Sequence, residues 1–190
     1  MKVTIQIVQA TLDRAPEAEA AVCGVAQDER PLRGPAGHAD WRMCGLLSQQ
    51  LLEQKYEGDA GEDLLTSTQG RLPFERLFLI GLGRTPKLDP AVARKLATRA
   101  GHVAVRAGVA TLTVPLWDLT RERIEFPEAL NAFLLGAGRA LAQGAPVEAL
   151  TLQLLARNPS EAGRMKHDLV RIAKKPPVDG MELDVPGAQG

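Results

Sequence analysis

Hydrophobic and polar positions alternate at the start of the chain, where Val3, Ile5 and Ile7 are separated by Thr4 and Gln6. A period of two is typical of a strand with one buried face. Residues 20–25 and 77–80 form apolar runs without this alternation, which indicates inner strands that are covered on both faces. Further strands are predicted at residues 64–68 and 76–80, paired through a turn at Gly70 and Pro73, and at residues 109–114 and 149–155.

Four segments carry apolar residues at helical spacing. The first lies between residues 36 and 54, with Asp40 as its expected N-cap and with Cys44, Leu47 and Leu51 on one face. The second begins at Asp89 and Pro90 and ends at Gly108, and the third begins at Pro127 and ends before Gly144. The fourth begins at Asn158, with Glu161 placed to complete a capping box.

These elements follow the order ββα-ββα-βα-βα, which predicts a largely parallel or mixed sheet with helices on both faces. We expect one domain over residues 1–173. From Lys174 onward, prolines and glycines without apolar periodicity predict a flexible tail over residues 174–190.

Composition excludes several broad classes of protein. The chain has 190 residues, enough for one core, and its 23 basic and 23 acidic residues give no general attraction to nucleic acid or to an anionic membrane. The only cysteines are Cys23 and Cys44, neither of which belongs to a C-x-x-C pair, so we expect a reducing compartment. The sequence contains no long apolar segment, and a cytoplasmic location is therefore expected.

Several short motifs resemble the N-terminal, non-catalytic domain of the leucyl (cytosol) aminopeptidase family. They are Pro31-Leu32-Arg33-Gly34, Gly45-Leu46-Leu47-Ser48, Tyr56-Glu57-Gly58, Gly61-Glu62, Phe133-Leu134-Leu135-Gly136-Ala137 and above all Arg76-Leu77-Phe78-Leu79-Ile80-Gly81-Leu82-Gly83. The resemblance covers most of residues 1–155. It implies an α/β fold of the macrodomain-like kind, a three-layer α/β/α sandwich with a mixed, mostly parallel sheet.

The chemistry of that family resides in a second domain with a two-metal site, and its signature, close to Asn-Thr-Asp-Ala-Glu-Gly-Arg, does not occur here. We therefore expect no peptidase activity, no catalytic residue, no metal and no cofactor. His38, Asp40 and Cys44 are close in sequence, but a capping aspartate and an inert core thiol explain them better than zinc does. Gly81-Leu82-Gly83 lacks the third glycine of a dinucleotide-binding loop, and a tight turn is the simpler interpretation.

The leading functional hypothesis is a regulatory or interaction module that binds a protein, such as a peptidase or further copies of this chain. The resemblance supports it, because in that family this domain helps to pack the oligomer. Its candidate partner-binding residues are Trp41, Trp117, Lys95, Arg99 and Arg106. One alternative is a nucleic-acid-binding accessory protein that uses the basic helix at residues 94–106. Another is a sensor of a small, nucleotide-like ligand.

Overall fold

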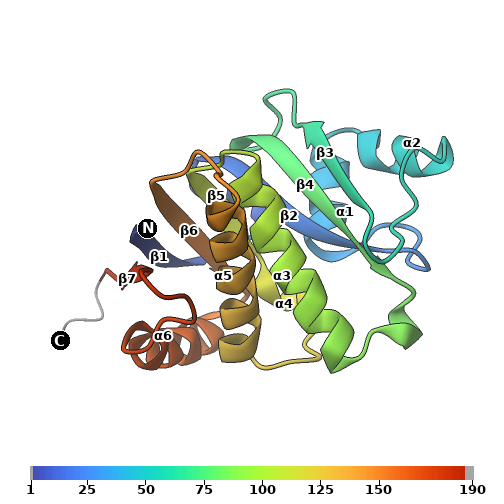
Figure 1. The fold of residues 1–190 in the computed structure, drawn as a ribbon. Helices are drawn as coiled ribbons and strands as arrows, with labels where there is room; N and C mark the ends of the chain where they lie inside the picture. The colour runs from blue at the N-terminus through green and yellow to red at the C-terminus, as the bar shows by residue number, and fades with distance from the viewer. Residues whose placement is uncertain (1, 187–190) are drawn as a thin grey trace.

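The computed structural model describes residues 2–186, which fold around one seven-stranded sheet (Figure 1). Its strands lie in the order β3-β4-β2-β5-β6-β1-β7. Only β3 runs antiparallel to its neighbour among the described strands, so the sheet is mixed and mostly parallel, as predicted. The strands are β1 (Lys2–Gln9), β2 (Ala18–Ala26), β3 (Asp63–Ser67), β4 (Phe74–Gly83), β5 (Thr111–Val114), β6 (Ala149–Ala156) and β7 (Glu182–Asp184).

Helices cover both faces of this sheet and make the three-layer sandwich that the sequence predicts. They are α1 (Gly34–Arg42), α2 (Leu46–Leu52), α3 (Pro90–Arg106), α4 (Leu116–Thr120), α5 (Phe126–Ala142) and α6 (Pro159–Ala173), with short 3₁₀ turns η1 (Leu12–Arg14) and η2 (Thr85–Lys87). The predicted caps of α3 and α6 are confirmed. The Asp89 carboxylate accepts the Val92 N–H at 2.8 Å, and the Asn158 side chain accepts the Glu161 N–H at 2.9 Å.

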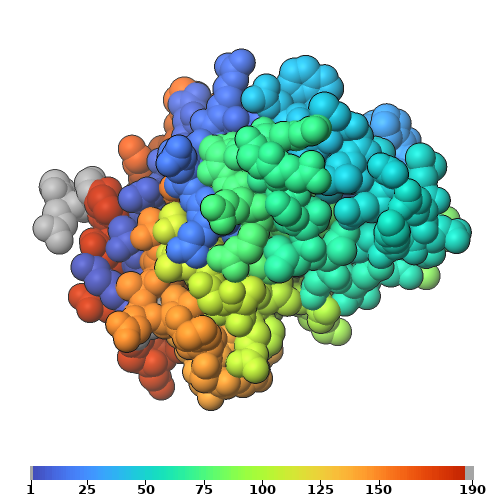
Figure 2. All heavy atoms as spheres, turned by 90° about the horizontal axis from the view of Figure 1, so that it is seen from above, coloured from blue at the N-terminus to red at the C-terminus, as the bar shows by residue number. Residues whose placement is uncertain are grey.

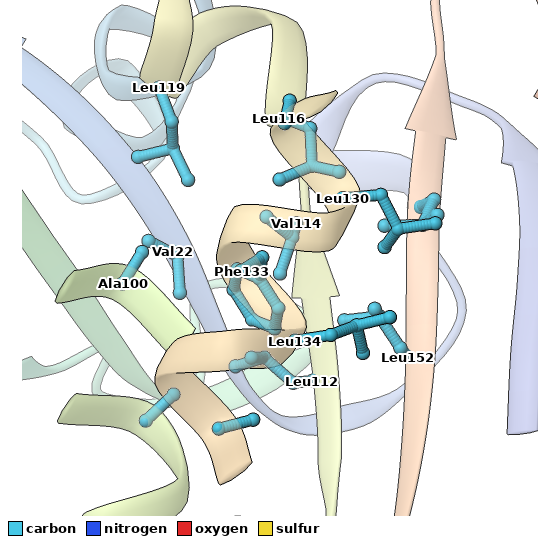
Figure 3. Packing of buried hydrophobic residues seen from close by; sticks show 14 of the residues in the cluster. Val22, Ala100, Leu112, Val114, Leu116, Leu119, Leu130, Phe133, Leu134 and Leu152 are labelled. Atoms are coloured by element: carbon cyan, nitrogen blue, oxygen red, sulfur yellow. The ribbon is translucent and has the colours of Figure 1, made fainter. Parts of the chain in front are cut away.

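The inner strands divide their side chains between two cores. In β2, Val22 belongs to the core beneath α3, α5 and α6, whereas Cys23 points to the opposite core beneath α1 and α2. Figure 3 shows the first core, in which Phe133 and Leu134 of α5 lie against Leu112, Val114 and Leu152 of the sheet. Burial of both faces explains the apolar runs that lack alternation.

Close contact between α3 and α5 depends on two glycines. A Cβ on Gly136 would lie 1.8 Å from the Thr98 carbonyl oxygen, and one on Gly101 would lie 2.1 Å from the Phe133 carbonyl oxygen. Each helix backbone therefore rests directly on the other, and a larger residue at either position would force the helices apart.

The first predicted helix is in fact two helices, and the predicted role of Asp40 was wrong. Asp40 lies inside α1 instead of capping it, and its carboxylate accepts the Ser48 N–H at 3.0 Å in the first turn of α2. The chain turns between the helices at Cys44 and Gly45, both with positive φ, which leaves the Cys44 thiol exposed instead of in the core.

Part of the segment predicted to be a tail is a strand. Residues 182–184 form β7, which pairs in parallel with residues 2–4 of β1, and Met181 is buried in the core beneath α6. Figure 2 shows these last described residues, in red, beside the dark blue N-terminal strand and at the end of the molecule opposite the cyan α1–α2 region. A strand of only three residues is too short to give a recognisable period of two in the sequence. Residues 187–190 lie outside the described part of the chain, and flexibility of the tail stays a prediction.

Candidate functional site

The carboxyl ends of parallel strands form the usual binding edge of an α/β sheet. At this edge the structure has two adjoining cavities of about 250 Å³ and 280 Å³. The first lies between α4, the start of α5 and the start of α6, and the second lies between the end of β1 and the start of α1. Trp117, Leu155 and Arg157 line both cavities, so the Trp117 and Arg157 side chains stand between them.

Arg157 is held by a set of contacts within the chain. Its guanidinium carbon lies 4.9 Å from the centre of the Trp117 ring, a cation–π contact. Its Nη2 donates to Glu161 Oε1 at 2.8 Å, and its Nη1 also pairs with Glu122. These hydrogen bonds to Glu161 and Glu122 raise the pKa of Arg157. The cation is thus already matched by two carboxylates.

Glu161 occupies the start of α6 with its own negative charge. Its Oε2 accepts the backbone N–H of Arg157 at 2.6 Å, whereas a capping box would have used the N–H of Asn158. Burial on its own would raise the pKa of Glu161, but the bonds from Arg157 outweigh it and lower that pKa. The start of α6, where an anion would be stabilised, therefore already carries a carboxylate of this chain.

The first cavity is lined by charged side chains, most of which are paired, and by apolar side chains. Four carboxylates line it against two guanidinium groups, a formal balance of two negative charges; these side chains are Glu122, Glu125, Glu161 and Asp168 against Arg157 and Arg164. Its apolar lining consists of Leu116, Ile124, Phe126, Ala129, Leu155 and Met165.

Asp118, next to Trp117, is a fully buried carboxylate. Its Oδ2 accepts the N–H of Gly24 at 2.9 Å, at the part of β2 beyond the residues that pair with β5. Its Oδ1 has no hydrogen bond within the described residues, although Arg121 Nη1 lies 3.7 Å away. The other terminal nitrogen of Arg121, Nη2, pairs with Glu29. Burial raises the pKa of Asp118 to about 6, against the lowering effects of Arg121 and of the Gly24 hydrogen bond.

The two tryptophans singled out from the sequence lie in different surroundings. Trp117 stands in the wall of the two cavities with its Nε1 buried and without a partner in the described structure. Trp41, near the end of α1, is 75% exposed and lies in a shallow depression with Arg42, Cys44, Gly70 and Arg71. The depression around Trp41 shares no lining residue with the two cavities beside Trp117.

Most basic side chains of the helix at residues 94–106, which is part of α3, are bonded to other groups of this chain. Arg99 makes two contacts with the Asp63 carboxylate, at 2.8 and 2.7 Å, and Arg106 donates to the Gln143 carbonyl at 3.1 Å. Arg94 pairs with Glu128. Lys95 is exposed and has no ion pair among the described residues. The basic helix therefore has fewer unpaired positive charges for a partner than the sequence suggests. None of its basic residues lines either cavity.

Gly81 and Gly83 have a role other than the predicted tight turn. Strand β4 continues through Gly83, and a Cβ on Gly81 would lie 2.0 Å from the Asp59 carbonyl oxygen. The glycines let the loop at residues 58–62 pack on the end of β4, where Gly83 donates its N–H to the Gly58 carbonyl at 2.9 Å. Across residues 2–186, no group of three His, Cys, Asp or Glu side chains is placed to hold a metal ion.

Comparison with known proteins places the chain in a family. Residues 21–143 match the model of the cytosol aminopeptidase family, N-terminal domain, and this range is nearly two thirds of the chain. The chain belongs to the cytosol aminopeptidase family. A "Probable cytosol aminopeptidase" from Trichormus variabilis is 27% identical over 94 residues, which are 48% of this chain and 19% of that protein. The chain thus matches the N-terminal domain of the family, and the match does not reach the rest of the relatives' length.

Solved structures show the same fold. A tomato leucine aminopeptidase mutant superposes with a TM-score of 0.58 and 15% identity, over 88% of this chain and 35% of the other. A Trypanosoma brucei macrodomain in complex with ADP superposes with a TM-score of 0.65 and 15% identity, over 87% of this chain and 68% of the other. The predicted macrodomain-like fold is therefore confirmed. No helix in the described part of this family member is long and apolar enough to cross a membrane.

Three groups at this place are not predicted from the sequence: Arg157, the bonds of Glu161 to Arg157, and Asp118, which is buried next to Trp117 but does not line the cavities. Asp118 interrupts an apolar stretch just after β5, and a carboxylate in such a position is a recognisable signal. Arg157 and Glu161 are four residues apart, but Arg157 precedes the helix, so the spacing alone does not predict their contact.

Proposed function

We propose that this chain is a non-catalytic binding module whose docking surface for a protein partner is the depression around Trp41. The observation that carries the proposal is the 75% exposure of the Trp41 side chain, because a large apolar ring gains most from being covered. The depression that contains Trp41 measures about 370 Å³ and is open to solvent. A cytoplasmic location, in keeping with the names of the relatives, belongs to the same proposal.

The two positive charges near Trp41 indicate which kind of partner would bind there. Arg42, whose guanidinium lies 5.8 Å from the indole centre, and Arg71 are both exposed and have no ion pair among the described residues. A partner segment that combines acidic side chains with one apolar side chain would match the two arginines and the indole. We therefore propose an acidic protein segment as the occupant.

The same part of the chain exposes other apolar side chains. Leu52 is 85% exposed on α2, and Leu65 is 48% exposed on the edge strand β3. In β3, Leu64 packs against the core beneath α1 and α2, so the next residue, Leu65, faces the α3 side of the sheet. Trp41 and Leu52 are therefore the exposed apolar side chains that support an interface on the α1–α2 side of the molecule.

We expect Trp41→Ala to weaken binding of an acidic peptide by about 2 kcal/mol, roughly thirtyfold, while the melting temperature stays unchanged. An array of acidic peptides with single apolar residues would supply the probe, and the best peptide would be titrated by fluorescence anisotropy. Arg71→Ala should weaken binding as well. Leu135→Ala is the matched control, because Leu135 is 41% exposed but lies on α5. Equal loss of binding in Leu135→Ala, or no preference for acidic over uncharged peptides, would refute the docking surface.

We also expect the chain to release no leucine from a chromogenic leucine amide with zinc, manganese or cobalt present. A two-metal hydrolase needs several ligands around each ion, and the described residues gather no such group. Release above a buffer blank that a chelator abolishes would contradict the non-catalytic role.

A second candidate function is binding of a small ligand in the cavities beside Trp117. Their position at the carboxyl edge of the parallel strands supports it, and so does the fold shared with a macrodomain whose structure contains ADP. The nucleic-acid alternative is less favoured, since Arg94, Arg99 and Arg106 of the basic helix already have partners within the chain.

A further inference from the structure

Strand β3 is the outermost strand at one edge of the sheet (Figure 1). The Gly81 N–H donates to the Glu62 carbonyl at 2.8 Å, and the Thr68 N–H donates to the Glu75 carbonyl at 2.9 Å. Because the direction of the backbone groups alternates along a strand, the even-numbered residues of this segment bond to β4 and the odd-numbered residues face away from it. The residues that face away are Asp63, Leu65 and Ser67.

The outward backbone groups of β3 are available to another strand. No hydrogen bond from the described residues reaches the N–H or the carbonyl of these three residues on that side. Proteins usually protect such an edge with proline, lysine, a bulge or a very short strand. Strand β3 has five residues, contains neither proline nor lysine, and pairs with β4 without a bulge. The opposite edge strand, β7, has only three residues. The edge at β3 is therefore the one that is open to pairing.

The side chains of β3 match those of a second β3 that runs antiparallel to it. Leu65 is 48% exposed, and pairing centred on this residue would place the two Leu65 side chains next to each other, where each covers the other. Asp63 would lie opposite Ser67 of the other copy, and its charge is already matched by Arg99 at 2.7 Å. The pairing thus buries apolar surface and places no like charges opposite each other.

Opposite charges stand beyond the two ends of β3. Asp59 precedes the strand and Arg71 follows it; both are exposed and have no ion pair among the described residues. Each lies six residues from Leu65, so antiparallel pairing centred on Leu65 brings Asp59 of each copy toward Arg71 of the other. The formal net charge of zero means that two copies do not repel each other as wholes. This charge complementarity favours a second copy as the occupant of the edge.

We propose that two copies of this chain associate by antiparallel pairing of β3 with β3, with Leu65 on the two-fold axis. The sheet of one copy then continues into the sheet of the other. The paired strands are short, so the dimer is weak and reversible. This contact differs from the docking of a protein segment at Trp41, although Arg71 would take part in both.

Sedimentation equilibrium of the full chain tests the association. We expect a reversible monomer–dimer equilibrium with a dissociation constant on the order of 10–100 µM. Leu65→Lys should weaken it at least about tenfold, because it places two like charges next to each other on the axis, and it should leave the melting temperature unchanged. Leu135→Lys is the matched control, since Leu135 is 41% exposed but lies on α5. A chain that stays monomeric at about 500 µM, or equal effects of the two lysine variants, would overturn the proposal.

Reversal of the charges tests the direction of the pairing. Asp59→Arg and Arg71→Asp would each place like charges at both ends of the paired strands, and each should weaken the dimer roughly fivefold. An equimolar mixture of the two variants should associate as tightly as the parent chain, because every end then joins opposite charges. Recovery in the mixture requires contact between copies. A mixture that associates no better than either variant alone would rule out this register.

Amide hydrogen exchange followed by NMR identifies the surface that is used. The three outward N–H groups of β3 should exchange rapidly at low protein concentration and become protected as the dimer forms. The N–H groups of Leu64 and Thr66, which bond to β4, should be protected at both concentrations. Protection that appears only outside β3 would show that another surface forms the dimer and would refute the strand pairing. These experiments follow the association of copies and not peptide binding, so a negative result leaves the docking surface at Trp41 untouched.

Discussion

Replacing Gly136 by alanine is expected to destabilise the fold by about 3 kcal/mol or more, although alanine is the better helix former. In an exposed helix interior the same substitution stabilises by roughly 0.5–1 kcal/mol. The sign reverses here because the added Cβ would lie 1.8 Å from the Thr98 carbonyl oxygen, a backbone atom that cannot move without shifting α3. The clash therefore outweighs the gain in helix propensity several-fold.

Gly101→Ala should behave in the same way, because its Cβ would lie 2.1 Å from the Phe133 carbonyl oxygen of α5. Gly163 on α6 is the matched control, since nothing lies within 4 Å of a Cβ added there. Gly163→Ala should stabilise by roughly 0.5–1 kcal/mol. Urea unfolding followed by circular dichroism would measure all three variants against the parent chain. Wild-type stability in Gly136→Ala would show that α3 and α5 do not touch as described.

Strong local signals made much of this fold predictable from the sequence. The caps at Asp89 and Asn158 are each followed by a proline, and the structure has both helices where these signals place them. The inner strands were equally clear, since burial of both faces requires continuous apolar residues such as those of β4.

The predictions that were wrong or missing concern features that depend on tertiary contacts. The Asp40 carboxylate satisfies an N–H of α2 because the chain reverses at Gly45, and helical periodicity alone does not reveal a reversal. Strand β7 is short and forms only by pairing with β1, about 180 residues earlier in the chain. The candidate cavities could not be predicted for the same reason. Trp117 and Arg157 are 40 residues apart in sequence, and only the packing of β6 beside β5 brings them together.

We expect Asp118 to make the stability of the chain depend on pH between about 4 and 6. Its pKa in the folded state is about 6, whereas its ordinary value is 3.8. In this window the folded state binds a proton that the unfolded state has released, so this group stabilises the fold below pH 4 and its contribution is lost as the pH rises to 6. A difference of about two pKa units corresponds to roughly 3 kcal/mol. Asp118 is fully buried, so solvent screening does not reduce this effect.

The measurement compares the parent chain with Asp118→Asn by urea unfolding at several pH values. Asparagine keeps an oxygen that can accept the Gly24 N–H but does not titrate, so the difference between the two chains isolates Asp118 from every other carboxylate. We expect the parent to lose roughly 3 kcal/mol relative to the variant between pH 4 and pH 7. Asp179→Asn, at an exposed position, should show no such trend. A constant difference between the parent and Asp118→Asn would mean that Arg121, 3.7 Å from Oδ1, compensates the buried charge in full. Because Arg121 also pairs with Glu29, we expect it to compensate only in part.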